Sequence, residues 1–182
     1  KLIIMKTLKT LIAVSLLLIT FGTAAQNDKD KKIMKDAEHA KSMIMEKDAG
    51  FEKFFSNASG YVIFPNVGKG GLIIGGASGN GVVYENGKAV GMADLKELSV
   101  GFKAGGQAIV EVVFFETDEA LANFKNGNYE FGAETSAVAV DKGVSQNTNY
   151  SDGVIVLTMP KAGLMADISV VGQKFSYHAF KM

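Results

Sequence analysis

Glycines surround a lysine in the stretch GKGG, Gly68 to Gly71, and this arrangement could bind an anion. Backbone amides in a glycine-rich turn, beside an ammonium group, suit a phosphate. A nucleotide-binding P-loop, however, needs the spacing GxxxxGKS/T at a strand-to-helix junction, where the helix adds its dipole. Lys69 is followed by two glycines and then by a strand pattern. Nucleotide binding therefore has little support, and a solvated corner between two strands is the simpler interpretation.

Metal binding and nucleophilic catalysis have few candidate residues in this sequence. It contains no cysteine and only two histidines, His39 and His178. Its acids never take the order of a calcium-binding loop, and no serine stands in a GxSxG nucleophile elbow. We therefore expect no catalytic residue, no metal site and no cofactor, and we interpret the protein as non-enzymatic.

Charge argues against a nucleic-acid partner. The sequence has 19 basic and 19 acidic residues, and every basic residue is a lysine. Nucleic-acid readers usually show a basic excess and use arginine on guanine and phosphate. Because residues 1–25 carry three lysines and no acid, the rest of the chain has a net charge of about −3. Any contact with anionic lipid must then come from a local lysine patch.

Residues 1–25 are predicted to be a signal peptide. From Met5 the sequence reads MKTLKTLIAVSLLLITFGTAAQ, in which lysines precede an apolar stretch and small residues follow it. The apolar stretch is shorter than the roughly 20 residues of a transmembrane helix. We expect cleavage after Ala25 and an exported protein, periplasmic or secreted; a cytoplasmic protein with a hydrophobic N-terminus is the alternative. Without cysteine, a lipoprotein anchor is excluded.

Residues 26–57 are predicted to form an amphipathic helical segment. Ile33, Ala37, Ala40 and Ile44 recur three or four residues apart, which places them on one face of a helix. Such a helix can lie in a membrane interface, or it can pack its apolar face on the domain that follows. Packing is favoured because the polar face mixes acids with lysines.

The end of this segment is aromatic. Gly50 is expected to interrupt the helix, and Phe51, Phe54 and Phe55 follow on a second amphipathic turn or two. Lys53 stands among these aromatic residues and could join a headgroup contact to apolar insertion. The three phenylalanines are therefore membrane-contact candidates and Lys53 is a headgroup candidate. The alternative is that the aromatic side chains cover one end of the sheet.

From residue 58 to residue 182 the pattern changes to period two with many glycines. Asn86-Gly87, between two extended runs, indicates a type I′ hairpin turn, and residues 108–116, AIVEVVFFE, have the composition of a buried strand. Thr117 is a suitable cap for a short helix near 118–125. We predict an α+β fold, with a glycine-rich, mainly antiparallel sheet or barrel-like core, an N-terminal amphipathic helix and this short helix.

Five separated blocks of the sequence resemble one protein family. ASGYVIFPNVGKGGLIIGGASGNGVVY is followed in order by SVGFKAGGQ, ALANFKNG, GAETSAVAV and GLMADISVVGQKFSY. Together they resemble the SYLF-domain family, whose members include bacterial exported proteins, and residues 58–182 would form the SYLF-like domain. The resemblance implies phospholipid binding, with an anionic phospholipid or a membrane surface as the partner. Phosphoinositides and actin, which eukaryotic members bind, are poor expectations for an exported protein.

The resemblance also implies site residues. The stretch FPNVGKGG matches the family's FPxVxKGG-like signature, which implies that Lys69 lies at a lipid headgroup. Gly68, Gly70 and Gly71 would form the glycine-rich turn around it. Lys103, in the second GG block, is a weaker headgroup candidate.

These patterns together lead to one hypothesis and two alternatives. The hypothesis is a non-enzymatic phospholipid-binding protein of the cell envelope. The alternatives are a structural or protein-interaction module of the envelope, and a carrier of an apolar ligand in an enclosed pocket. The sequence assigns neither a protein partner nor an oligomeric state.

Overall fold

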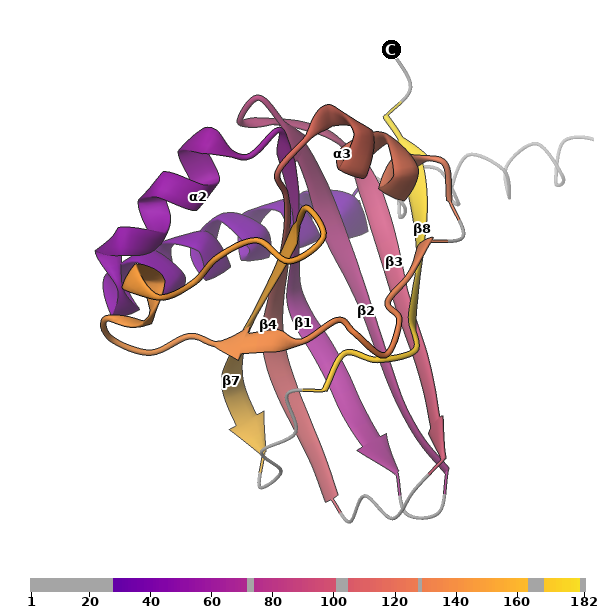
Figure 1. Ribbon diagram of the computed structural model, residues 1–182. Coiled ribbons are helices and arrows are strands. Elements are labelled where there is room, and N and C mark those ends of the chain that lie inside the picture. The colour runs from indigo at the N-terminus through magenta and orange to yellow at the C-terminus, as the bar shows by residue number, and fades with distance from the viewer. Residues whose placement is uncertain (1–27, 72–73, 101–104, 128, 164–168, 181–182) are drawn as a thin grey trace, which may run out of the picture. The chain divides into compact units, whose positions relative to one another are not determined.

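A curled sheet of eight strands forms the body of the structure (Figure 1). The computed structural model describes residues 28–71, 74–100, 105–127, 129–163 and 169–180. The chain divides into two units, Lys1–Lys32 and Ile33–Met182, and the sheet belongs to the second unit. The strands are β1 (Gly60–Gly71), β2 (Ile74–Glu85), β3 (Lys88–Val100), β4 (Gly105–Phe115), β5 (Tyr129–Glu130), β6 (Ala137–Ala139), β7 (Val154–Gly163) and β8 (Gln173–Ala179).

The order of the strands explains why the sheet curls. It runs β5-β8-β3-β2-β1-β4-β7-β6, so β5 and β6 form the two edges. Only residues 131–136 separate these edge strands along the chain, which holds the edges near each other and makes the sheet a half-barrel. All neighbouring strands are antiparallel except β6 and β7, which are parallel. The predicted α+β fold with a mainly antiparallel, barrel-like sheet is confirmed.

Short local signals account for the turn and the helix that the sequence predicts. Asn86 and Gly87 connect β2 to β3 with φ angles of 52° and 73°, as a type I′ turn requires. Thr117 caps the helix α3 (Asp118–Lys125): its hydroxyl oxygen accepts a hydrogen bond from the Ala120 amide at 3.2 Å. Both predictions are confirmed.

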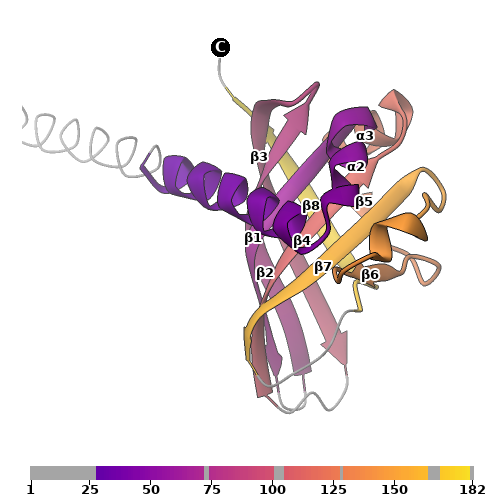
Figure 2. The same cartoon turned by 90° about the vertical axis from the view of Figure 1, so that its left-hand side faces the viewer.

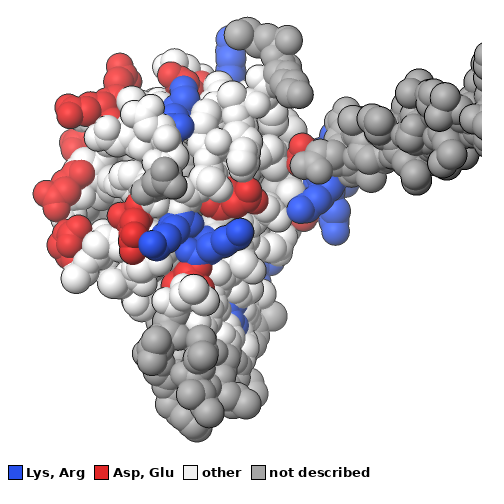
Figure 3. All heavy atoms as spheres, turned by 90° about the vertical axis from the view of Figure 1, so that its right-hand side faces the viewer, with Lys and Arg blue, Asp and Glu red and all other residues white. Residues whose placement is uncertain are grey.

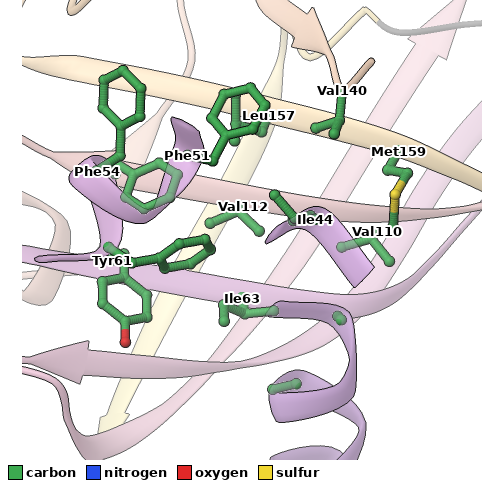
Figure 4. Close-up of a cluster of buried hydrophobic side chains, with 14 of the residues drawn as sticks. Ile44, Phe51, Phe54, Tyr61, Ile63, Val110, Val112, Val140, Leu157 and Met159 are labelled. Carbon is green, nitrogen blue, oxygen red and sulfur yellow. The ribbon is translucent and has the colours of Figure 1, made fainter. Parts of the chain in front are cut away.

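From residue 33 onwards, the N-terminal helical segment covers one face of the sheet, which we call the outer face (Figure 2). This segment consists of a helix over residues 28–47, the short helix η1 (Ala49–Phe51) and α2 (Glu52–Asn57). Ala37, Ala40 and Ile44 are at most 2% exposed, because they pack against side chains of β1, β4 and β7. Figure 4 shows Ile44 in this cluster. From residue 33 onwards, therefore, the expectation that the helix packs on the domain is confirmed.

The opposite face, the inner face, has a core of its own. Alternate residues of the strands supply it, so that Val62 faces inward while its neighbour Tyr61 faces outward. Leu121 and Phe124 of α3 extend this core and are at most 2% exposed. Its other members include apolar residues of β1 to β4, β7 and β8. The inner face is thus largely apolar, which makes the polar side chains on it conspicuous.

Candidate functional site

Six polar side chains are buried on the inner face, and we call them the inner cluster. They come from β1, β3, β4, β7 and β8, and none is more than 7% exposed. Strand register places them in pairs across neighbouring strands: Lys69 with Gln107, Glu111 with Thr158, and Glu97 with Gln173. Since buried polar groups are unfavourable unless they are paired, their contacts decide what the cluster can do.

Lys69 is the cation of the inner cluster. Its Nζ lies 3.9 Å from Oε2 of Glu97 and donates a hydrogen bond to the backbone carbonyl of Ser169. The side chains of Lys69 and Glu97 are each 2% exposed. The ammonium group of Lys69 is therefore satisfied inside the protein.

Glu111 is the titratable group of the inner cluster. Gln173 donates from Nε2 to Oε2 of Glu111 at 3.1 Å and to Oε2 of Glu97 at 3.4 Å. Burial raises the pKa of Glu111 to about 7, against the opposing effects of the Gln173 hydrogen bond and the Lys69 charge. Glu111 can therefore exchange a proton near neutral pH.

The prediction of a glycine-rich turn around Lys69 is wrong. Gly68, Gly70 and Gly71 lie within β1, and Lys69 is 4% exposed instead of standing at a solvated corner. The physical reason is that β1 pairs with β2 on one side and with β4 on the other as far as Gly71. The strand therefore continues through the glycines, and Lys69 projects onto the inner face.

The aromatic membrane-contact candidates lie in the outer core. Phe51 is fully buried, and Phe54 and Phe55 are each 6% exposed. The ring centroid of Phe55 lies 5.2 Å from that of Tyr61 in an edge-on arrangement. In this structure the three rings cover the sheet, as the alternative interpretation describes.

Lys53, a second lysine candidate, lies apart from Lys69, on α2 instead of β1. Lys53 donates from Nζ to the backbone carbonyl of Ser145 at 3.0 Å, and the same atom lies 4.8 Å from the ring centroid of Phe54. Lys53 therefore bridges α2 and η2 (Val144–Gln146). Lys103 lies outside the described residues. The structure does not bring Lys53 and Lys69 together in one site.

An exposed apolar residue marks the outer surface near the end of β3. Leu98 is 86% exposed, which is the largest value among the big apolar side chains in the described part of the chain. Lys96 lies two residues earlier on the same face of β3, opposite Lys174 of β8, and both are exposed. Figure 3 shows lysine side chains on this side of the molecule, with acidic side chains beside them. We call Leu98, Lys96 and Lys174 the β3 surface.

Acidic residues gather near α3. Two adjoining hollows, of about 120 and about 390 Å³, share Tyr129 and Asp152 in their walls. Four glutamates also line them: Glu116 and Glu119 in the larger hollow, and Glu130 and Glu134 in the smaller. Neither hollow is lined mainly by apolar side chains, so neither resembles the carrier pocket that the sequence leaves open.

Two further properties of the described residues bear on function. They contain no group of three or more His, Asp or Glu side chains arranged to hold a metal ion. Across the same ranges, no helix combines the length and the apolar character needed to cross a bilayer.

The fold and the inner cluster define a class of protein: an α+β half-barrel domain with buried ionic groups on its inner face. The particular family follows from a comparison with family models. Residues 96–179 match the family Ysc84, described as Las17-binding protein actin regulator, which is the SYLF domain family. Over this segment the chain matches the SYLF domain family, as the sequence resemblance predicts. No curated protein matched the chain in a second comparison.

Sequence reasoning misses the acidic members of the inner cluster. Glu111 interrupts the apolar run AIVEVVFF, and an isolated charge inside such a run is a signal that the side chain needs a buried partner. Glu97 and Gln173 carry no comparable local signal, because their strands alternate polar with apolar residues.

Proposed function

We propose that this SYLF-domain protein binds anionic phospholipid surfaces peripherally, through the β3 surface. The observation that carries the proposal is the 86% exposure of Leu98. An apolar side chain that stands in water gains free energy when it enters a lipid interface, about 1.5–3 kcal/mol for full burial of a leucine. Members of this family are generally non-catalytic, which accords with a binding function.

The lysines beside Leu98 support an anionic surface as the partner. Lys96 is exposed on the same face, and Lys174 opposite it is only partly neutralised by Glu130, 3.2 Å away. Each lysine near an anionic membrane contributes on the order of 1 kcal/mol. A local patch of this kind allows lipid binding although the chain after residue 25 has a net charge of about −3.

The end of the sheet nearest Leu98 is also suited to a membrane contact. β1 and β3 end there, and β2 and β4 begin there, because Gly71 pairs with Gly105 and Ile74 pairs with Val100. Val100 and Gly105 are the described residues that flank the segment with Lys103, so this headgroup candidate belongs to the same proposal.

Charge separation along the sheet favours one orientation. Glu116, Glu119 and Asp152 lie beyond the opposite end of β4, next to α3. An anionic surface repels these acids and attracts the lysines of the β3 surface. The protein is therefore expected to approach a membrane with the β3 surface first.

The proposal also includes export of the protein to the cell envelope. Residues 1–25 have the order of a signal peptide, which supports export and a role at the cell envelope. Mass spectrometry of the protein purified from its native envelope fraction tests this. A chain that begins at Gln26 is the expected result, and an uncleaved chain in the cytoplasm contradicts it.

Vesicle co-sedimentation tests the lipid proposal. The chain without residues 1–25 is mixed with vesicles of phosphatidylcholine alone, or of phosphatidylcholine with phosphatidylglycerol, at low and high salt. Binding is expected only with phosphatidylglycerol and should weaken with salt. Leu98→Ser is expected to weaken it by about tenfold and Lys96→Ala by about fivefold, from the free energies of burial and surface attraction.

Matched controls lie at the other end of the same sheet. Lys88 is an exposed lysine eight positions before Lys96 on β3, and Phe180 is 36% exposed just after β8. Lys88→Ala and Phe180→Ser should bind vesicles as the parent chain does. If all four variants bind equally, or if the folded protein binds no vesicle, the proposal is wrong.

The acidic hollows favour a protein-interaction module as the second candidate. The family description names binding to Las17 and regulation of actin, which are protein interactions. Two results together would support this candidate: the folded protein binds no vesicle, and Glu119→Lys abolishes its binding to a protein partner.

A further inference from the structure

The inner cluster contains one more carboxyl group than ammonium groups. Among the described members of the cluster, Glu97 and Glu111 are the carboxyl groups and Lys69 is the ammonium group, and the three are at most 5% exposed. The remaining groups that face Glu111 from the neighbouring strands are uncharged: Gln107 on β4, Thr158 on β7, Gln173 on β8, and Ala77 at the same level of β2. Because Glu111 is fully buried, its ionised form is strongly unfavourable there, and one proton removes that charge.

The hydrogen bonds indicate which atom carries the proton. Gln173 Nε2 already donates to Glu111 Oε2 at 3.1 Å. Among the described residues, the second oxygen of each group, Glu111 Oε1 and Gln173 Oε1, has no hydrogen-bond partner. Two acceptors cannot bond to each other, whereas a carboxylic O–H donates to an amide carbonyl. A proton on Glu111 Oε1 would give this oxygen a hydrogen to donate to Gln173 Oε1, and the acid and the amide would then form a cyclic pair.

The cluster also contacts both ends of one chain segment, which is held in addition by backbone hydrogen bonds between Gly172 and Phe131 and between Phe131 and Gln173. Lys69 holds the carbonyl of Ser169, while Glu111 and Glu97 hold the side chain of Gln173. Between these ends Val170 is fully buried in the inner core. We call residues 169–173 the inner strap, because the segment lies against the inner face and leads into β8.

We propose that Glu111 is a proton-binding site that controls closure of the inner face: the protonated acid–amide pair with Gln173 holds the inner strap, and loss of the proton releases it. Release follows because ionised Glu111 keeps one of the two hydrogen bonds and adds a second negative charge beside Glu97. Burial raises the pKa of Glu111 to about 7, which places this change near neutral pH. The proposal does not depend on lipid binding.

Two measurements on the unmodified protein test it. Carbon-13 NMR of the glutamate carboxyl groups follows the protonation of Glu111, with the resonance assigned by its loss in Glu111→Gln. Hydrogen–deuterium exchange of peptides that cover residues 169–175 follows release of the strap. We expect the carboxyl carbon to titrate near pH 7. Protection of the strap amides, corrected for intrinsic exchange, should fall above that pH by at most about tenfold per pH unit, the limit for one proton.

Two isosteric variants test whether the proton on Glu111 is the cause of the pH-dependent release of the strap. Glu111→Gln supplies a permanent N–H donor to Gln173, so protection of the strap should become independent of pH. Glu97→Gln removes the competing carboxylate and leaves Lys69 to Glu111, so the transition should move to lower pH.

Two results would overturn the proposal. Titration of Glu111 in the wild-type protein close to the ordinary glutamate value of 4.5 would overturn it. Strap exchange in Glu111→Gln with the pH dependence of the wild type would also overturn it.

Discussion

Glu111 shows how one buried carboxyl group makes the stability of this protein depend on pH. Its partners are an amide and a lysine that is shared with Glu97. Burial favours the neutral acid in the folded state, whereas water favours the ionised acid in the unfolded state. A single side chain therefore ties folding to proton uptake.

The unfolding free energy is expected to fall as the pH rises from about 4.5 to about 7. The contribution of the neutral Glu111 is fully present below the pKa of the unfolded state and is lost as the pH passes the raised pKa of the folded state. The loss amounts to about 3 kcal/mol, at about 1.4 kcal/mol per pKa unit. Urea unfolding at several pH values measures it.

Glu111→Gln should remove most of this pH dependence. Glu119→Gln is the matched control, because Glu119 is an exposed acid in the first turn of α3. The control should keep the slope of the wild type. Equal slopes in all three proteins would show that Glu111 ionises normally.

At the scale of elements, the glycines of β1 and β2 differ in the space around them. A Cβ atom on Gly81 would lie 2.6 Å from Cδ1 of Phe64 and 2.7 Å from the carbonyl oxygen of Ile63. A Cβ atom on Gly68 would meet nothing within 4 Å. Gly81 therefore allows β2 to approach the side chain of Phe64, whereas Gly68 has no such role.

Alanine substitutions should separate these two glycines. Gly81→Ala is expected to lower the unfolding free energy by roughly 1–3 kcal/mol, as overpacking usually does. Gly68→Ala should leave it unchanged or raise it by up to about 1 kcal/mol, because the unfolded chain loses conformational freedom. Thermal and urea unfolding measure both, and similar losses in the two variants would contradict the packing at Gly81.

For the whole molecule, the helix over residues 28–47 supplies part of the outer core. Ala37, Ala40 and Ile44 cover strand residues that include Ile63 and Val112. Removing the helix would expose these side chains to water, at about 25 cal/mol per Å² of apolar area. A deletion of residues 26–57 is therefore unsuitable for locating a lipid site, since it removes core residues.

Two truncations test this dependence. The chain from residue 33, where the second unit begins, should fold and unfold cooperatively. The chain from residue 48 should aggregate or lose cooperative unfolding, because its outer face is uncovered. Circular dichroism and size-exclusion chromatography distinguish the two results, and a stable monomer that begins at residue 48 would contradict the role of the helix.

Elements with local signals could be predicted from the sequence. The Asn86-Gly87 turn depends on backbone conformations of two residues, and the cap of α3 depends on Thr117 and an amide three residues away. The helical period of Ile33, Ala37, Ala40 and Ile44 likewise indicates which face is buried. These features involve few residues, so the sequence alone determines them.

Tertiary structure alone decided the surroundings of the lysine between the glycines. Lys69 binds the carbonyl of Ser169, 100 positions along the chain, and the carboxylate of Glu97 two strands away in the sheet. The sequence by itself determined the buried strand over residues 108–116, the Asn86-Gly87 turn, the short helix after Thr117 and the family resemblance. Which face of β1 Lys69 occupies depends on the register of three strands and on the curl of the sheet, and neither is encoded in the residues near it.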